Sequence, residues 1–98
     1  MNYIYEIKIL NIRRYIGITN DPNRRLSQHK RSIKKQDKKT LYQEIIKLNL
    51  TEKDIEMNIL FQYENRTEAI RKEAQLTLND WFDNKELWQH PLYYAKYY

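Results

Sequence analysis

An arginine and a histidine stand four residues apart, at Arg25 and His29, inside a segment with helical periodicity. Because four residues make about one helical turn, both side chains are expected on the same flank of the helix, beside its buried stripe. A guanidinium group can bind an anion, and an imidazole can transfer a proton near neutral pH. A solvated helix flank is the plainer interpretation of the pair, and the spacing alone does not exclude it.

A glutamate, Glu73, falls at the edge of the apolar stripe of a later helix, between Ala69 and Ile70 on one turn and Leu76 and Thr77 on the next. A carboxylate in this position is either an ion-pair partner, with Arg25 as a candidate, or a metal ligand. Because the chain has no cysteine, a metal would have to be held by carboxylate, imidazole or water. The same absence excludes disulfides and thiol nucleophiles.

Two tyrosines, Tyr5 and Tyr15, lie in segments that alternate with a period of two. Residues 2–10 and 13–19 are therefore predicted to form an antiparallel hairpin, in which both tyrosines could face the same way. The only glycine, Gly17, lies inside the second strand. It indicates a bulge, a bend or a close-approaching group, and the functional interpretation is room for a phosphate or metal beside the strand. Taken singly, each tyrosine is more simply a residue of the sheet.

The elements after the hairpin follow from capping residues and periodicity. Asp21 and Pro22 have the types expected at a helix start, and Asn65 with Glu68 has the spacing of a capping box. Alternation of apolar with polar residues predicts a third strand with Ile55, Met57, Ile59, Phe61 and Tyr63 on one side. The predicted helices run from Pro22 to about Lys35, from Leu41 to about Leu48, and from Asn65 to about Trp81.

The composition is that of one soluble globular domain. The chain has 98 residues, of which 41% are hydrophobic and 32% charged, and no repeat or flexible linker divides it. We therefore expect a single domain over residues 1–98, with an aromatic C-terminal extension over about residues 82–98 that packs on the sheet or meets a partner. The sequence shows no signal peptide and no apolar run long enough for a membrane, so we expect an intracellular, cytoplasmic protein.

The positive charge is concentrated in the first half of the chain. Residues 1–49 contain twelve Lys and Arg against four Asp and Glu, whereas residues 50–98 contain six against nine. The basic half is where a polyanion would dock, although a solvated helix and loop would have the same composition. The candidate nucleic-acid contacts on the first helix are Arg24, Lys30, Arg31, Lys34 and Lys35, and the strand before it adds Gly17.

The order of these segments resembles the GIY-YIG nuclease family over nearly the whole chain. The matching residues are Tyr3-Ile4-Tyr5, Tyr15-Ile16-Gly17, Thr19, Arg25-Leu26, His29, Glu68-Ala69 and Glu73. The first triplet reads Tyr-Ile-Tyr where the family name has Gly-Ile-Tyr, but it keeps the tyrosine that the family uses, Tyr5. The family's closing asparagine has only Asn79 and Asn84 as counterparts here, and neither stands in a convincing context.

The resemblance implies an α+β fold, in which helices flank a small three-stranded antiparallel sheet in the order β-β-α-α-β-α. It also implies a metal-dependent endonuclease with one Mg²⁺ or Mn²⁺ ion per active site. Glu73 would hold the ion, Arg25 the scissile phosphate, and His29 would orient a tyrosine or relay its proton. Either Tyr5 or Tyr15 would act as the base. The catalytic set that the resemblance implies is Tyr5, Tyr15, Arg25, His29 and Glu73.

The family also implies DNA as the substrate, with RNA left open, and a role in a phage, a mobile element or restriction. A phage protein would act in the host cytoplasm. A homodimer would explain how one active site per chain yields a double-strand break. One alternative is a non-catalytic nucleic-acid-binding module that kept the fold and the basic face. Another is a structural or RNA-associated basic protein in which the aromatic tail, Tyr93 to Tyr98, mediates assembly. No recognition module is present in the sequence, so the target sequence is not assigned.

Overall fold

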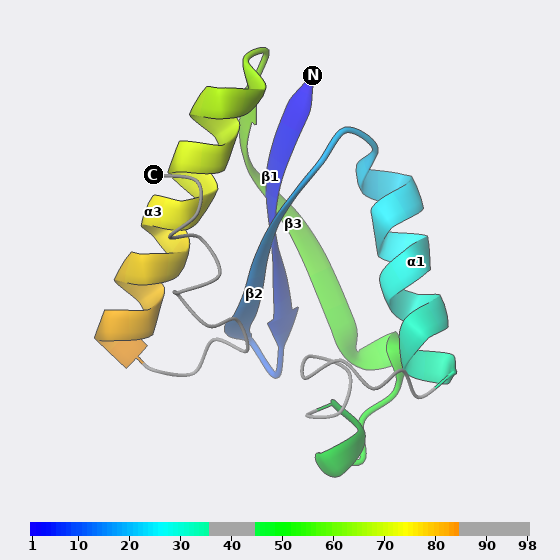
Figure 1. The fold of residues 1–98 in the computed structure, drawn as a ribbon. Coiled ribbons are helices and arrows are strands. Elements are labelled where there is room, and N and C mark those ends of the chain that lie inside the picture. Colours follow the sequence, from blue (N-terminus) through cyan, green and yellow to red (C-terminus); the bar gives the residue numbers. More distant parts are fainter. Residues whose placement is uncertain (36–44, 85–98) are drawn as a thin grey trace.

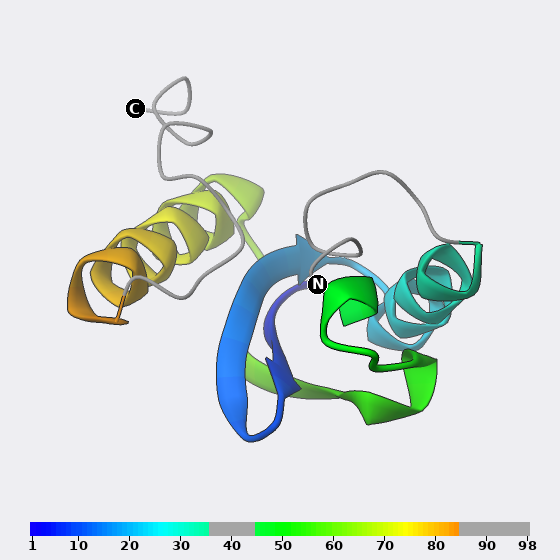
Figure 2. The same cartoon turned by 90° about the horizontal axis from the view of Figure 1, so that it is seen from below.

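The computed structural model describes residues 1–35 and 45–84. An antiparallel sheet with the strand order β2-β1-β3 forms the centre of the described part. Its strands are β1 (Asn2–Ile9), β2 (Ile12–Thr19) and β3 (Ile55–Tyr63). Two helices flank the sheet on opposite sides (Figures 1 and 2), and these are α1 (Pro22–Lys34) and α3 (Arg66–Asn84). This arrangement confirms the predicted α+β fold with a three-stranded antiparallel sheet.

A tight turn at Leu10 and Asn11 joins the first two strands. Both residues have positive φ angles, 56° and 63°, and Ile9 pairs with Ile12 across the turn. Two consecutive left-handed residues form the kind of two-residue turn whose twist matches that of the strands it connects. The predicted hairpin is therefore confirmed.

Capping residues begin both long helices. The side chain of Asp21 accepts a hydrogen bond of 3.1 Å from the backbone N–H of Arg24. At the start of α3, Asn65 Oδ1 accepts one of 3.2 Å from the N–H of Glu68. Both helix starts were predicted from these residue types. No helix in the described ranges is long and apolar enough to cross a membrane.

The helix predicted from Leu41 to Leu48 is only partly covered by the structure. Residues 45–47 are helical, and residues 41–44 lie outside the described part of the chain. A short 3₁₀ helix, η1 (Glu52–Asp54), follows and was not predicted. Its signal is a capping box, in which Thr51 accepts from the N–H of Lys53 and Asp54 accepts from the N–H of Thr51.

The main apolar cluster lies between the sheet and α1. Tyr5, Ile7 and Ile9 of β1 point into it, and Ile33 of α1 packs against them with Leu26 beside it. This confirms Leu26 and Ile33 as the buried stripe of the helix. Ile45 and Ile55 complete the cluster. The α1 face of the sheet, defined as the face that carries Tyr5, is therefore the side on which α1 brings its residues to the strands.

The opposite face of the sheet carries an ion-pair network that binds it to α3. Glu6 is buried, and its Oε1 accepts a 2.6 Å hydrogen bond from Arg13 Nε. Asn58 Nδ2 donates to the other carboxylate oxygen of Glu6 at 3.1 Å. Arg13 Nη1 donates to Asp80 Oδ2 of α3 at 2.8 Å. Because Arg13 bridges two carboxylates from different elements, it fixes α3 against the hairpin.

The third strand does not keep the alternation that its sequence predicts. Ile55 is buried and Met57 partly buried in the apolar cluster, but Ile59 is 42% exposed and Phe61 is 39% exposed. The pairing with β1 shifts between Ile4 and Tyr5, so that Tyr5 opposes Ile59 while Ile4 opposes Phe61. Opposed residues share a face, and the shift therefore moves Phe61 to the face that carries α3. The prediction of one apolar side for the whole strand is wrong from this point onward.

Candidate active site

The ring of Tyr5 lies across β2 at Gly17. Tyr5 is 0% exposed and pairs with Gly17 in the register of the two strands. A Cβ atom added to Gly17 would lie 2.7 Å from Tyr5 Cε1 and still closer to Cζ and Oη. Any larger residue at this position would therefore collide with the ring. The missing side chain is required by close approach of another side chain, which is one of the reasons for glycine in a strand.

Among the interpretations of Gly17, the packing confirms a close-approaching group and contradicts a bulge. The register is regular at Gly17, and the irregularity between β1 and β2 lies between Ile7 and Lys8. A bulge at Gly17 is therefore wrong. The space that a side chain at Gly17 would take is filled by the Tyr5 ring.

The hydroxyl of Tyr5 joins two residues of α1. It lies 2.9 Å from His29 Nε2, and Arg25 Nε donates a hydrogen bond to it at 3.2 Å. His29 is 1% exposed, so its ring depends on protein partners. With Tyr5 protonated, its hydroxyl can donate to Nε2 of neutral His29 while it accepts from Arg25. The predicted proximity of Arg25 and His29 is thus realised, and Tyr5 is what connects them.

Burial keeps this tyrosine protonated. It raises the pKa of Tyr5 far above the ordinary value, and nearby Tyr15 raises it further, whereas the charge and hydrogen bond of Arg25 act in the opposite direction. Burial also acts to lower the pKa of Arg25, but the phenol oxygens of Tyr5 and Tyr15 outweigh it and raise the pKa above its ordinary value. The site therefore presents a permanent cation beside a neutral phenol.

Tyr15 completes a cluster of three rings. It pairs with Ile7, which places it on the same face as Tyr5. Its ring centroid is 6.0 Å from that of Tyr5 and 5.4 Å from that of His29, with an edge-on angle of 72° to the imidazole. Unlike Tyr5, it is partly exposed. The prediction that both tyrosines face the same way is confirmed.

Sequence reasoning missed Gln28, which holds the arginine from its own helix. Its Oε1 accepts a 3.1 Å hydrogen bond from Arg25 Nη1. The spacing of three residues on a helix was available as a signal, because residues three apart are neighbours on the helix surface. Gln28 and Tyr5 together fix the plane of the Arg25 guanidinium group.

The fifth predicted residue, Glu73, comes from the other helix. This carboxylate at the edge of the apolar stripe is 6% exposed, and so it is buried. Thr77 Oγ1 donates to its backbone carbonyl at 2.9 Å. Helix α3 packs on β2 and β1, from the face opposite to the one that carries Tyr15 and Tyr5. The hydrogen bonds and ring contacts above thus join four of the five predicted residues, and Glu73 is the member contributed by a separate helix.

The donor atoms available to a metal are few. Within residues 1–35 and 45–84, no three His, Cys, Asp or Glu side chains gather closely enough to hold an ion. A buried carboxylate such as that of Glu73 supplies hard oxygen ligands, which suits a cation that keeps several waters. The chemistry of this side chain therefore fits Mg²⁺ or Mn²⁺ held by one carboxylate, and it does not fit a closed structural metal site.

The predicted nucleic-acid contacts on α1 are exposed. Lys34 Nζ lies 3.8 Å from Glu52 Oε1 of η1, with its side chain 67% exposed. A pair that is exposed to this degree contributes little to stability, so Lys34 can exchange this partner for a phosphate at little cost. The predicted contacts that are exposed are Arg24, Lys30, Arg31, Lys34 and Lys35.

Comparison with known proteins agrees with this geometry. The family model described as the GIY-YIG catalytic domain matches residues 1–82, a range that includes all five predicted catalytic residues. No match was found among curated proteins or among solved structures. The match covers the sheet, α1 and most of α3, and so it covers every element that contributes to the candidate site.

Proposed function

Because this chain belongs to the GIY-YIG family of nucleases, we propose that it is a metal-dependent endonuclease that hydrolyses phosphodiester bonds in DNA. The observation that carries the proposal is the contact of Tyr5 with both Arg25 and His29. One buried and one partly buried hydrogen bond hold an imidazole and a cation around one phenol, beside a second tyrosine that is partly exposed. Such a group of titratable residues is typical of a catalytic site.

Arg25 is the residue that would bind the scissile phosphate. Its guanidinium stays charged, and Gln28 and Tyr5 each hold one of its nitrogen atoms. A fixed guanidinium donates to phosphate oxygens without first losing side-chain freedom. It would therefore stabilise the negative charge that grows on the phosphate as the attacking water adds.

Tyr15 is better placed than Tyr5 to contact the attacking water. Tyr5 is 0% exposed and holds its proton tightly, so it would serve as a positioning residue for Arg25 and His29. Tyr15 is partly exposed and lies against the edge of the His29 ring. In the proposed reaction the water oxygen bonds to phosphorus and gives its proton to the hydroxyl oxygen of Tyr15, which releases its own proton to solvent, while the His29 ring positions Tyr15. The bond from phosphorus to the 3′ oxygen then breaks, and the 3′ oxygen takes a proton from water.

Glu73 is the residue that would hold one Mg²⁺ or Mn²⁺ ion. When bound, such an ion neutralises phosphate charge and lowers the pKa of water. Glu73 supports this role because it is a buried carboxylate with hard oxygen ligands, on the helix that packs against the opposite face of the strands that carry the two tyrosines. Water and phosphate oxygens would complete the coordination sphere, as is usual for Mg²⁺.

A supercoiled-plasmid nicking assay tests the proposal. Wild-type protein should nick plasmid with Mg²⁺ or Mn²⁺ and not with EDTA. Glu73→Gln should lose nicking while keeping its fold, whereas Glu64→Gln, an exposed carboxylate just before the same helix, should keep it. Salt-sensitive DNA binding without nicking in any protein would instead identify a non-catalytic nucleic-acid-binding module.

A homodimer is part of the proposal, because one active site per chain cuts one strand at a time. Light scattering with and without DNA should show a dimer on DNA. A monomer under both conditions, together with double-strand cleavage, would rule the dimer out. Repeating the nicking assay with an RNA of the same sequence separates a DNA nuclease from one that accepts both nucleic acids.

A further inference from the structure

The register shift in β3 gives two aromatic residues a position outside the candidate active site. Phe61 opposes Ile4 and Tyr63 opposes Asn2, whereas Ile59 opposes Tyr5. Phe61 and Tyr63 therefore lie on the face that carries α3, and Ile59 lies on the α1 face. Bulges of this kind redirect side chains, and they are common beside functional sites. The consequence here is a pair of aromatic rings away from the main apolar cluster.

The two rings and a lysine form a surface that we call the aromatic surface, comprising Phe61, Tyr63 and Lys72. The rings of Phe61 and Tyr63 are stacked, with centroids 6.4 Å apart and planes 30° from parallel. Phe61 is 39% exposed. Lys72 Nζ lies over the Phe61 ring, 4.8 Å from its centroid. A ring pair with one exposed member and a cation above it presents both a stacking surface and a positive charge.

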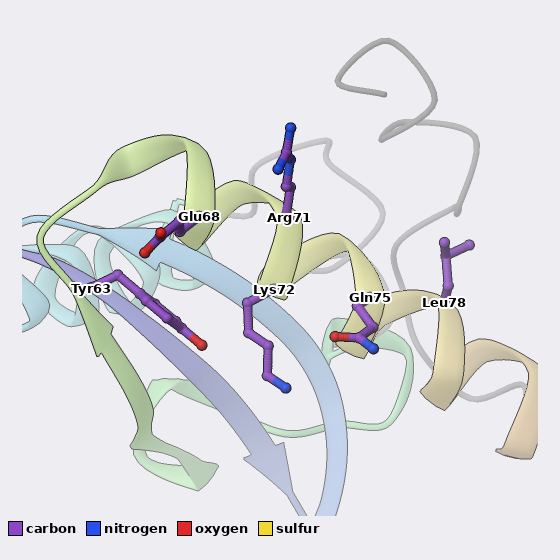
Figure 3. Close-up of a pocket in the computed structure, with 6 residues that line it drawn as sticks. All are labelled: Tyr63, Glu68, Arg71, Lys72, Gln75 and Leu78. Carbon is purple, nitrogen blue, oxygen red and sulfur yellow. The ribbon is translucent and has the colours of Figure 1, made fainter.

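A pocket adjoins this surface, between the end of β3 and α3. Its volume is about 540 Å³, within the range of sites that take a small ligand. Tyr63, Lys72 and Gln75 extend toward one another along the pocket, whereas Arg71 points away (Figure 3). The lining residues are Tyr63, Glu68, Arg71, Lys72, Gln75 and Leu78.

We propose that the aromatic surface and its pocket bind an unpaired nucleobase of the nucleic acid substrate, outside the segment that is cleaved. This inference rests on the proposed function, since it concerns the same substrate. Exposed aromatic rings beside a cation are the features that bind single strands, because every base has a face that can stack. Lys72 would contact the adjoining phosphate. Glu68 and Gln75 line the pocket with oxygen acceptors for the amino groups of bases.

The polar groups around the rings favour nucleic acid over a protein partner. The cores of protein interfaces are poor in lysine and glutamate. Here Lys72 covers Phe61 directly, and Glu68 lines the same pocket as Tyr63. Burying both charged groups under a protein would cost desolvation free energy, whereas a nucleotide offers a phosphate to one and an amino group to the other.

Fluorescence anisotropy with a labelled oligothymidylate and a duplex of equal length tests the inference, in EDTA to prevent cleavage. Phe61→Ala should weaken single-strand binding about 5- to 150-fold for each base that it stacks. Phe61→Tyr should keep binding, because it keeps the ring. Ile59→Ala is the matched control, since Ile59 is equally exposed on the same strand but lies on the other face. It should leave the affinity unchanged.

The salt dependence of binding tests the charge of Lys72 separately. Lys72→Gln should lower the slope of log affinity against log salt by about 0.7 for a single strand, and Lys72→Arg should preserve it. A merely structural role of Lys72 would change the free energy of unfolding without changing the salt slope. Equal slopes for wild type and Lys72→Gln would overturn the assignment of a phosphate contact.

Crosslinking identifies where the base lies. An oligonucleotide with 5-bromouracil should crosslink to Phe61 or Tyr63 on irradiation, as mass spectrometry of the peptides would show. Crosslinks confined to the α1 face, or a change only in oligomeric state with Phe61→Ala, would overturn the inference. Plasmid nicking by wild type is scored separately. If wild type nicks plasmid but Phe61→Ala does not change single-strand affinity, this inference is wrong and the proposed endonuclease stands. If Tyr63 crosslinks to the base but wild type does not nick, the proposed endonuclease is wrong and this inference stands.

Discussion

Gly17 and Tyr5 are matched across two neighbouring strands, and the ring of the tyrosine occupies the space that a side chain at Gly17 would fill. The only glycine of the chain is thus placed where it lets a phenol reach over the edge strand to α1. The Tyr5 hydroxyl then meets Arg25 and His29. The contact of Tyr5 with Arg25 and His29, on which the proposed site depends, therefore requires glycine at position 17.

Gly17→Ala should therefore displace Tyr5 and lower both stability and nicking. Overpacking of this kind typically costs about 1–3 kcal/mol in free energy of unfolding, which urea titration would measure. The loss of nicking should exceed what unfolding explains, because the displaced hydroxyl no longer holds Arg25. In a Tyr5→Ala background the same substitution should cost little, since the clash is gone. An equal cost in both backgrounds would show that the ring is not the reason for the glycine.

The raised pKa of Tyr5 predicts a loss of stability in alkali. Above the ordinary tyrosine pKa of 10.0 the unfolded chain releases this proton, whereas the folded protein keeps it. The unfolded state then binds fewer protons than the folded state, so the free energy of unfolding falls as pH rises, by up to about 1.4 kcal/mol per pH unit. Below pH 10 this contribution is fully present.

The comparison of wild type with Tyr5→Phe isolates that effect from the other tyrosines. Tyr5→Phe should be less stable at pH 8, because His29 and Arg25 lose a buried partner, at a cost of about 1–3 kcal/mol. Urea titrations from pH 8 to 11 should show the gap between the two proteins closing as pH rises. A constant gap over this range would mean that Tyr5 is not held protonated by the fold.

Periodicity and capping residues predicted most of the fold. The strands, both long helices and the shared face of Tyr5 and Tyr15 follow from local patterns, because residue spacing maps directly onto one face of a helix or strand. The spacing of Arg25 and His29 predicted their proximity for the same reason. These features depend on residues that are close in the sequence or repeat with a fixed period.

Tertiary packing decided the features that the sequence did not reveal. The shift opposite Ile4 and Tyr5 moves Phe61 to the other face, although its sequence spacing from Ile59 is that of a regular strand. The fit of the Tyr5 ring over Gly17 depends on the register of β1 and β2. The alternation of apolar and polar residues does not determine which residue of one strand pairs with which residue of the other. The burial of Glu73 depends on how α3 is rotated against the sheet, and that rotation is fixed by contacts between distant residues.

Arg25 and Arg24 should behave differently although they are neighbours. Arg25→Ala should lower the nicking rate by about 10²- to 10³-fold, as loss of a donor to a developing negative charge does. Arg25→Lys should not restore it, because lysine cannot replace the contacts of Nε and Nη1 with Tyr5 and Gln28. Single-turnover kinetics at saturating protein would separate this effect from weaker binding.

Arg24 is exposed, and it is the matched control on the same helix. Arg24→Ala should leave the single-turnover rate unchanged and lower the salt slope for duplex binding by about 0.9. Equal and small effects of the two substitutions would show that Arg25 has no special role in the reaction.

The bridge from Arg13 to Glu6 and Asp80 should control the attachment of α3, and with it the position of Glu73. The Glu6 side chain is 6% exposed and that of Arg13 is 29% exposed. Removing Arg13 leaves the buried Glu6 carboxylate with only Lys8, whose Nζ lies 4.0 Å away, as a cationic partner, so Arg13→Ala should cost about 2–3 kcal/mol, less than the 3–5 typical of a fully buried pair. Asp80→Ala should cost about 1 kcal/mol, because that carboxylate is nearer to water.

The effect on Glu73 can be separated from general destabilisation. If the bridge holds Glu73 in place, Asp80→Ala should raise the metal concentration that gives half-maximal nicking, at a temperature where the protein is fully folded. Glu6→Gln combined with Arg13→Ala should recover part of the lost stability, because the buried charge is gone, but it should not recover the metal dependence, because α3 still lacks its ion pair. Recovery of both together would mean that the network stabilises the hairpin and has no separate influence on the position of α3.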